Sequence, residues 1–240
     1  LCGLLLHYYG MEPWDALMHA FSIMGLGGFS SKDASLGHFQ SLPIEMVAMG
    51  FALLSGLNFA THFMALRSRS LRPYLMDSEI PYYFGALALS ILGLTAYLQF
   101  FGLYPDFTTA LRHVAFHSVS LATSLGLATT DYTMWPMFAQ LWMLFLGSFI
   151  ACSGSTGGGI KMMRAVILYK QLFREIKSLA HPQAVSPVKV AGQVVADPVV
   201  FAVLGFFFVW VALLVTMTLI LGWTGLDAMT AFSAVVASLN

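Results

Sequence analysis

The stretch DFTTALRHVAFHSVSLATSLGLATTD, residues 106–131, decides the class of fold, because the chain carries its pattern three times. Each copy begins near an acidic residue, continues as an amphipathic stretch rich in Ala, Phe and Ser, and reaches a segment of Gly, Ser, Thr or Asn. The other copies are DALMHAFSIMGLGGFSS at 15–31 and DAMTAFSAVVASLN at 227–240. Each copy follows an apolar stretch and is too short to cross a bilayer. Exposed backbone at membrane depth is tolerated only where protein buries it or where it lines a watery pathway, so the pattern predicts re-entrant pore loops.

Composition indicates a membrane protein. Hydrophobic residues make up 58% of the chain and charged residues only 9%, whereas roughly a quarter of the residues of soluble domains are charged. The apolar runs lie at residues 1–10, 43–66, 81–103, 134–152 and 198–222. All but the first reach or approach the roughly 20 residues that a helix needs to cross a bilayer. The sequence therefore predicts an all-α polytopic membrane protein, and its opening inside an apolar run without a Met predicts a fragment.

The placement of charge predicts the orientation of the chain. Nine of the 11 Lys and Arg residues fall at 67–72, 161–177 and 189, and by the positive-inside rule these segments face the cytoplasm. The short repeats then enter from the outer face, where acidic residues collect: Glu12, Asp15, Asp33, Asp106, Asp131 and Asp227. A mouth lined with carboxylates favours cations over anions.

Three units follow from the order of spanning and short stretches. The first covers 1–66, with a short helix at about 13–24, and a basic turn at 67–80 follows it. The second covers 81–179, with a short helix at about 106–122, and a linker at 180–197 leads to the third at 198–240. Proline residues in the linker argue against a continuous helix there. If the C-terminal end of each short helix points into the membrane, its partial negative charge favours a cation held there.

The segments that follow the short helices carry glycines suited to a selectivity filter. Backbone carbonyls replace the water around a cation without a formal charge that would trap it. Gly permits the φ angles that turn successive carbonyls toward one axis. Gly25, Gly27 and Gly28, within 25–29, and Gly126, within 123–127, have this character. Any one of them could be an ordinary loop glycine, but the repetition favours a filter.

The run SGSTGGG at 153–159 interrupts a helix that is otherwise expected over 134–179. Glycines cost roughly 1 kcal/mol each relative to Ala inside a helix, so the helix should break there. The break falls at membrane depth, beyond the filter on the cytoplasmic side, where a gate would lie. A kink for helix packing is the alternative, and Lys170 and Arg174 are expected to reach for the membrane interface.

Enzyme motifs do not fit the same residues. A Walker A loop needs Lys directly after the last Gly, where Ile160 stands, and a nucleophile elbow at Ser155 needs Gly at position 153, which is Ser. The sequence therefore predicts neither an enzyme nor a cofactor. Cys2 and Cys152 lie in apolar segments without metal-ligand spacing, which indicates packing roles.

Two pairs of polar residues have helical i, i+4 spacing. His113 and His117 could bind a metal, but no acidic third ligand stands nearby in the sequence, so buried hydrogen-bonded roles are expected. Asn58 and His62 fall on the span expected at 43–66. For them a functional role and helix-to-helix hydrogen bonding both remain open.

A family resemblance rests on six segments spread over nearly the whole chain: GGFSSKDASLG at 27–37, SGLNFATHF at 55–63, SLATSLGLATTDYTMWP at 120–136, GSTGGGIKMMR at 154–164, HPQAV at 181–185 and SAVVASLN at 233–240. In this order they resemble the Trk/Ktr/HKT superfamily of potassium uptake proteins, most closely its TrkH members. The resemblance implies four membrane helix–pore loop–membrane helix units around a central ion pore. This chain would hold the second unit (1–66), the third (81–179) and the start of the fourth (198–240).

The resemblance also implies particular site residues. The K⁺ filter would comprise Gly25, Leu26, Gly27, Gly28, Thr123, Ser124, Leu125, Gly126, Leu239 and Asn240. The intramembrane loop at 153–159 would be the gate, with Gly154, Ser155, Thr156, Gly157, Gly158, Gly159, Lys161 and Arg164. The sequence departs from the family at Gly25 and Leu26, where a filter Thr is more usual, and at Leu127, where Phe is common.

Partners and location are implied in the same way. The resemblance indicates potassium uptake across a bacterial inner membrane by a homodimer in the lipid bilayer, with K⁺ as the transported ion and no nucleic-acid partner. A cytoplasmic nucleotide-binding regulatory subunit similar to TrkA would dock on the basic segments 67–72 and 170–177. An ion-coupled secondary carrier that uses the same re-entrant loops is the alternative, since carriers also contain repeats with broken helices.

Overall fold

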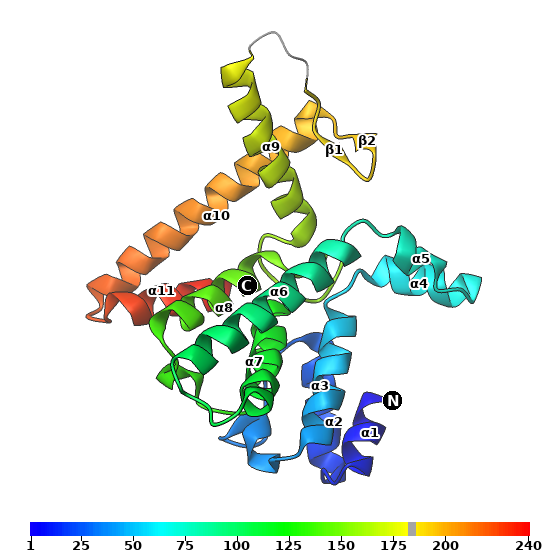
Figure 1. Ribbon diagram of the computed structural model, residues 1–240, viewed down its shortest axis with the longest axis vertical. Coiled ribbons are helices and arrows are strands. Elements are labelled where there is room, and N and C mark those ends of the chain that lie inside the picture. The colour runs from blue at the N-terminus through cyan, green and yellow to red at the C-terminus, as the bar shows by residue number, and fades with distance from the viewer. Residues whose placement is uncertain (182–185) are drawn as a thin grey trace. The chain divides into compact units, whose positions relative to one another are not determined.

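The computed structural model describes residues 1–181 and 186–240 and divides into two compact units, residues 1–159 and 160–240, each of which is described by itself (Figure 1). Helices form most of both units, and the sheet in the described residues is a single two-stranded hairpin. The predicted all-α membrane class is therefore confirmed. Within the segment HPQAV, residues 182–185 lie outside the described residues.

The N-terminal part of the first unit contains five α-helices: α1 (Cys2–Tyr8), α2 (Pro13–Gly25), α3 (Leu42–Ser55), α4 (Phe59–Ser68) and α5 (Arg72–Met76), with the 3₁₀ helix η1 at Ser35–Phe39. Proline lies in the first turn of α2, α3 and α5. It is tolerated there because its fixed φ suits a helix and its missing N–H has no helical partner to lose. α1, α2 and α3 pack against one another.

The apolar run at 43–66 is not one continuous helix. α3 and α4 meet at 93° across a short break at residues 56–58. Asn58 ends the break by capping α4, where its Oδ1 accepts a hydrogen bond from the N–H of Ala60 at 2.9 Å. Asn favours such caps because its side chain competes for nearby backbone groups. Asn58 and His62 therefore do not share the continuous spanning helix that the sequence suggested.

The C-terminal part of the first unit contains α6 (Ile80–Phe100), α7 (Phe107–Ala122), the 3₁₀ helix η2 (Tyr132–Met134) and α8 (Met137–Phe149). α7 packs against both α6 and α8. Asp106 caps α7 by accepting a hydrogen bond from Thr109 N at 2.8 Å, which satisfies one of the free N–H groups at the helix start. α8 ends at Phe149 and the next helix begins at Met162, so the interruption covers 150–161 and is wider than the run 153–159.

The second unit contains α9 (Met162–Ala180), the strands β1 (Lys189–Val190) and β2 (Gln193–Val194), α10 (Asp197–Trp223) and α11 (Ala228–Leu239). The hairpin was not expected in the linker. Its two-residue turn, Ala191–Gly192, has positive φ at both positions, which suits the twist of a tight antiparallel pair. The guanidinium of Arg164 lies 4.2 Å from the ring centre of Phe206 and ties α9 to α10.

Among the described residues, two helices are long and apolar enough to span a membrane, α6 with 21 residues and α10 with 27. The bent pair α3 and α4 passes the same test when it is counted as one span. α8 is an apolar helix of only 13 residues, so the run at 134–152 yields less helix than its length suggests. The helix ends where the chain turns into the loop at 150–161.

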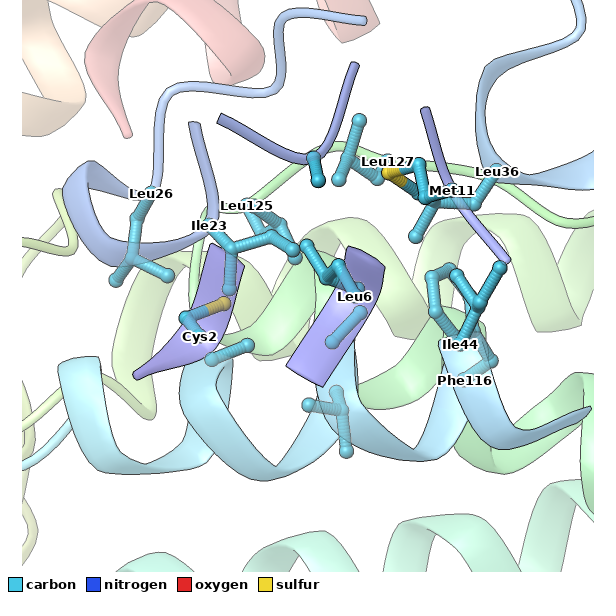
Figure 2. Close-up of a cluster of buried hydrophobic side chains, with 14 residues drawn as sticks. Cys2, Leu6, Met11, Ile23, Leu26, Leu36, Ile44, Phe116, Leu125 and Leu127 are labelled. Atoms are coloured by element: carbon cyan, nitrogen blue, oxygen red, sulfur yellow. The ribbon is translucent and has the colours of Figure 1, made fainter. Parts of the chain in front are cut away.

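The main apolar core of the first unit lies between the two repeats (Figure 2). Its members come from α1, α2 and α3 of the first repeat and from α7 and the segment after it in the next repeat: Cys2, Leu6, Ile23, Leu26, Ile44, Phe116, Leu125 and Leu127 are among them. Leu26 and Leu125 belong to the two predicted filter segments. Burial of their side chains anchors both segments to a common core.

Candidate functional site

The two predicted filter segments meet in space although Gly28 and Gly126 are 98 residues apart in sequence. A Cβ added to Gly126 would lie 3.7 Å from the Cα of Gly28, and one added to Gly28 would lie 2.6 Å from the carbonyl oxygen of Leu125. Gly28 also has a φ of +72°, a conformation that side chains with a Cβ rarely adopt. The close approach and the backbone conformation both require glycine at position 28.

The two segments follow the same backbone course. Positive φ angles recur at Leu26 and Gly28 in one segment and at Ser124 and Gly126 in the other. The N–H groups of Gly27 and Leu125 each bond the carbonyl five residues earlier, at 2.8 and 2.7 Å. The N–H groups of the preceding residues, Leu26 and Ser124, bond the carbonyl three residues earlier, at 3.3 and 3.1 Å.

This pair of bonds is the Schellman ending of a helix, which requires a left-handed residue. Gly usually occupies that position, but Leu26 and Ser124 stand there in this chain. Both α2 and α7 therefore end in the same turn at equivalent places. Each turn lies within its predicted filter segment, at Leu26 or Ser124, and directs the chain from the helix end toward Gly28 or Gly126.

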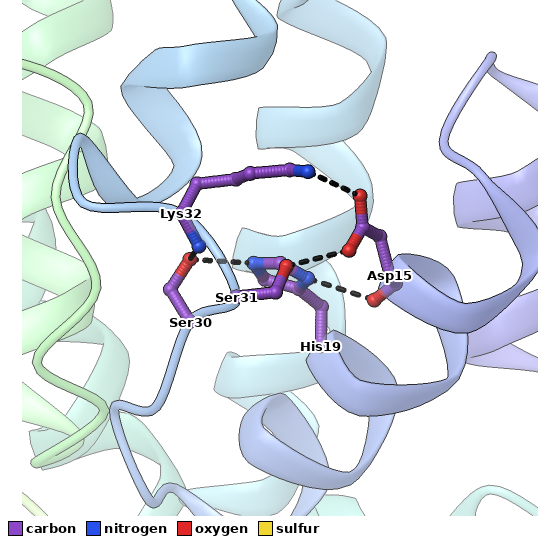
Figure 3. Close-up of polar contacts among 5 residues, drawn as sticks. All are labelled: Asp15, His19, Ser30, Ser31 and Lys32. Atoms are coloured by element: carbon purple, nitrogen blue, oxygen red, sulfur yellow. Dashed lines mark hydrogen bonds and ion pairs between the residues drawn. The ribbon is translucent and has the colours of Figure 1, made fainter.

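Polar side chains on α2 bond the chain that follows the first segment (Figure 3). The fully buried ring of His19 bonds the carbonyl of Asp15 through Nδ1 at 2.7 Å and the hydroxyl of Ser30 through Nε2 at 2.9 Å. The carboxylate of Asp15 accepts a hydrogen bond from Ser31 Oγ at 2.7 Å and pairs with Lys32 Nζ at 3.1 Å. The Ser31 hydroxyl, followed by the Lys32 ammonium, lowers the pKa of Asp15.

The second segment is braced by uncharged groups. His117, also fully buried, lies with Nδ1 at 2.9 Å from the carbonyl of His113 and with Nε2 at 3.1 Å from the carbonyl of Thr130. The buried hydroxyl of Ser120 donates to the carbonyl of Leu127 at 2.6 Å. These bonds join α7 to the chain that leaves the filter segment.

A buried ion pair joins the two repeats. Arg112 on α7 donates two parallel hydrogen bonds to the carboxylate of Glu45 on α3, at 2.8 and 2.7 Å. The side chain of Glu45 is 3% exposed and that of Arg112 is 33% exposed. Such two-pronged pairs fix orientation as well as supplying attraction. This pair was not predicted from the sequence, although an acidic residue inside an apolar run, as Glu45 is, indicates a buried partner.

The loop between α8 and α9 packs its backbone against the break between α3 and α4. Cys152 N donates to Gly56 O at 3.0 Å, and Phe59 N donates to Gly154 O at 3.1 Å. Ser153 N donates to Glu79 Oε2 at 2.6 Å. Each interruption thus supplies hydrogen-bond partners for backbone groups that the other would leave unpaired.

The same loop reaches the second filter segment. Gly158 N donates to Ser124 Oγ at 3.3 Å. A Cβ on Gly157 would lie 2.8 Å from both the carbonyl oxygen of Thr123 and the Cβ of Ala151. Only glycine lets the loop approach the Thr123 carbonyl this closely. Glu79 precedes α6 and holds the loop through Ser153. Its carboxyl group is buried, and burial raises its pKa.

The structure brings most of the predicted site residues together within the first unit: Gly25, Leu26, Gly27, Gly28, Thr123, Ser124, Leu125, Gly126 and the loop residues 154–159. Leu239 and Asn240, at the end of α11, and Lys161 and Arg164, at the start of α9, belong to the second unit. In the described part of the chain, no cluster of three or more His, Cys, Asp or Glu side chains is arranged to hold a metal ion.

Four of the six acidic residues expected at the outer mouth have local partners. Asp106, Asp131 and Asp227 each accept hydrogen bonds at the start of their own short helix, and these bonds lower the pKa of each carboxyl. Asp15 pairs with Lys32 instead. The carboxylates of these four residues are therefore ionised at neutral pH. The positive charge of Lys32 partly offsets the negative charge of Asp15.

Comparisons with known proteins identify the family. The sequence profile of the TrkH family, described as a cation transport protein family, matches residues 6–92 and 101–240. The Trk system potassium uptake protein TrkH of Salmonella typhimurium is 38% identical over the whole of this chain and 50% of its own length, and that of Halomonas elongata is 41% identical over the whole chain and 49% of its own length.

The crystal structure of the potassium transporter TrkH from Vibrio parahaemolyticus superposes with a TM-score of 0.94 at 38% identity, over 98% of this chain and 51% of that one. The chain thus spans about half the length of the relatives it matches. The profile match covers nearly every residue and includes both segments that meet at Gly28 and Gly126. This chain belongs to the TrkH family of cation transport proteins.

Proposed function

We propose that this chain supplies two of the filter segments of a potassium uptake pathway, Gly25–Gly28 and Thr123–Gly126, and the gate that controls it. The observation that carries the proposal is the meeting of Gly28 and Gly126 with one shared backbone course. Carbonyl groups presented by such segments replace the hydration shell of K⁺. Leu239 and Asn240 would begin a further segment of the same filter.

The gate in this proposal is the loop Gly154–Gly159, with Lys161 and Arg164 anchoring the helix that follows it. Its support is the contact of Gly157 and Gly158 with Thr123 and Ser124. A loop held against a filter segment obstructs the pathway and must move for ions to pass. Its hydrogen bonds to the break at 56–58 and to Glu79 hold the closed position.

The relatives named Trk system potassium uptake protein favour a bacterial inner-membrane protein that works with further components. We include in the proposal a homodimer and a cytoplasmic nucleotide-binding regulatory subunit similar to TrkA. In the first unit, the surface on which this subunit docks is formed by the exposed basic residues Arg67, Arg69 and Arg72. In the second unit, Arg174 is engaged with Asp197 at 2.7 Å and Lys170 with the carbonyl of Lys189 at 2.6 Å.

The test is K⁺ and Na⁺ uptake into liposomes that contain the full-length protein carrying this sequence. Gly28→Ser and Gly126→Ser should each lower the K⁺ to Na⁺ uptake ratio. The factor by which the ratio falls should exceed the factor by which the yield of folded protein falls. Selectivity indifferent to both substitutions would remove these segments from the filter. That result would favour the ion-coupled carrier. A rate of K⁺ uptake far below that of ion conduction would support the carrier further.

The gate has a separate test in the same liposomes. Deletion of Gly157–Gly159 should raise K⁺ uptake in the absence of a regulatory subunit, because the obstruction is shortened. Unchanged or lower uptake, with K⁺ selectivity intact, would contradict the gate and leave the filter proposal standing.

A further inference from the structure

Two buried histidines stand at equivalent places in the two repeats, and neither takes part in the proposed ion path. His19 precedes Gly28 by nine residues, and His117 precedes Gly126 by nine residues. Both rings are fully buried, on α2 and α7 respectively. A buried imidazole without hydrogen-bond partners would carry a large desolvation cost, so its contacts indicate why it is there.

The contacts repeat as well as the positions. In each ring Nδ1 lies within hydrogen-bond distance of the carbonyl four residues earlier in its own helix, at 2.7 Å for His19 and 2.9 Å for His117. In each ring Nε2 reaches the chain that leaves the filter segment, at Ser30 or at Thr130. Each imidazole therefore lies between the helix that enters a filter segment and the chain that leaves it, within hydrogen-bond distance of both.

We propose that His19 and His117 are positioning residues for ion selectivity, each holding its filter segment at the spacing that K⁺ requires. This inference rests on the proposed function. The Schellman turn fixes the start of each segment, and the imidazole bridge fixes the chain beyond it. With both ends held, the carbonyls between them cannot relax around a smaller ion.

The two bridges differ in strength because their partners differ. The carbonyl of Asp15 can only accept, so Nδ1 of His19 carries the proton and Nε2 accepts from the hydroxyl of Ser30. One neutral ring thus makes both bonds. His117 lies between two carbonyl oxygens, those of His113 and Thr130, and a neutral ring can donate to only one of them. The His19 bridge is the stronger.

A packing role is separable from positioning by substitution with Phe. The ring of His19 contacts Phe39 edge-on at 5.6 Å between centroids, and Phe at position 19 keeps an aromatic ring there while losing both hydrogen bonds. The matched control is His38→Phe. His38 contacts the same Phe39 edge-on at 5.2 Å, is exposed, and has no side-chain hydrogen bond within the described ranges.

The experiment measures the K⁺ to Na⁺ uptake ratio in liposomes with matched amounts of folded full-length protein. His19→Phe should lower the ratio about three- to tenfold, the effect of losing hydrogen bonds of ordinary net strength. His117→Phe should lower it by less, and His38→Phe should leave it unchanged.

A second pair of variants keeps the test decisive if His19→Phe does not fold. Ser30→Ala removes the far partner of the ring without touching α2, and Ser30→Thr keeps the hydroxyl. A lower ratio in Ser30→Ala with recovery in Ser30→Thr supports the bridge. If His19→Phe and Ser30→Ala both keep the parent ratio while Gly28→Ser lowers it, the bridge is overturned and the filter stands. If Gly28→Ser also keeps the parent ratio, the proposed function fails and the inference fails with it.

Discussion

The segments around Gly28 and Gly126 follow the same course but are supported differently. Behind Gly28 stands a charged network in which Asp15 pairs with Lys32 and Ser31. Near Gly126 the supporting groups are uncharged, namely the hydroxyl of Ser120 and the imidazole of His117. The loop at 150–159 hydrogen-bonds the second segment through Ser124, and a Cβ on its Gly157 would lie 3.6 Å from the side chain of Leu26 in the first.

The difference separates the features that the two segments share from those that each repeat adds. The left-handed turns and the buried histidine recur in both repeats, so they belong to the shape of the segment itself. The ion pair at Asp15 and the loop at Ser124 each occur in one repeat. If the loop is the gate proposed above, a change in its contacts should affect the segment that ends at Gly126, because the loop hydrogen-bonds Ser124.

The largest effect is expected where the two repeats are joined. Arg112→Ala leaves the buried Glu45 carboxylate without its partner and should lower the free energy of unfolding by about 3 kcal/mol. Thermal unfolding in detergent measures the loss. The double variant Arg112→Leu/Glu45→Leu should recover much of it, because the unpaired buried charge is gone. An unchanged unfolding temperature in Arg112→Ala would mean that the pair does not hold the repeats together.

Steric pressure on the loop should have the next largest effect. Gly157→Ala places a Cβ 2.8 Å from the Thr123 carbonyl oxygen, and overpacking of this kind costs about 1–3 kcal/mol. We expect a lower unfolding temperature and a higher basal K⁺ uptake. Gly85→Ala on α6 is the control, since a Cβ there meets no atom within 4 Å. If both variants behave alike, the loop does not press on the second segment.

Equivalent serines in the two repeats should respond differently to the same substitution. Ser120→Ala removes the buried bond to Leu127 O and should cost about 1–2 kcal/mol of unfolding free energy. Ser22 precedes Gly28 by six residues, as Ser120 precedes Gly126, but in the described part of the chain its buried hydroxyl has no partner. Ser22→Ala should therefore be neutral or slightly stabilising. Equal costs in unfolding experiments would contradict the difference in support.

The smallest effect should come from the charged network behind Gly28. The pKa of Asp15 is lowered in the folded chain, so its stabilising contribution is present above the ordinary value of 3.8 and is lost as the pH falls through the lower folded pKa. Asp15→Asn should reduce the unfolding temperature at pH 7, and the gap from the parent should close below about pH 4. A gap that is constant across this range would show that ionisation of Asp15 does not stabilise the fold.

Much of this arrangement is predictable from the sequence because the repeats share one sequence pattern. The short helices, α2 and α7, begin and end close to the residues where proline, aspartate and glycine place them. The glycines at 28 and 126 stand out for the same reason, although sequence alone does not show that they meet. That meeting depends on the shared core around Leu26 and Leu125, which forms between residues far apart in the chain.

The features that sequence reasoning missed depend on long-range partners. The bend at 56–58 is marked locally by Gly56 and Asn58 alone, and the apolar composition of the run around them favours a continuous span. The break is tolerated because residues near 152–154 supply its hydrogen bonds. The wider interruption at 150–161 has the same cause, since after Ile150, which still bonds Leu146 O of α8, the backbone at Cys152 and Gly154 is bonded to the break.

The mutual pairing of these two breaks also constrains how the protein is made. Gly56 is synthesised 96 residues before its partner Cys152, which at typical elongation rates is roughly 5–20 s. During that interval the backbone at the bend lacks the partners that make it tolerable in lipid. We therefore expect the bend between α3 and α4 to form late in biogenesis, once residues 152–154 have been synthesised.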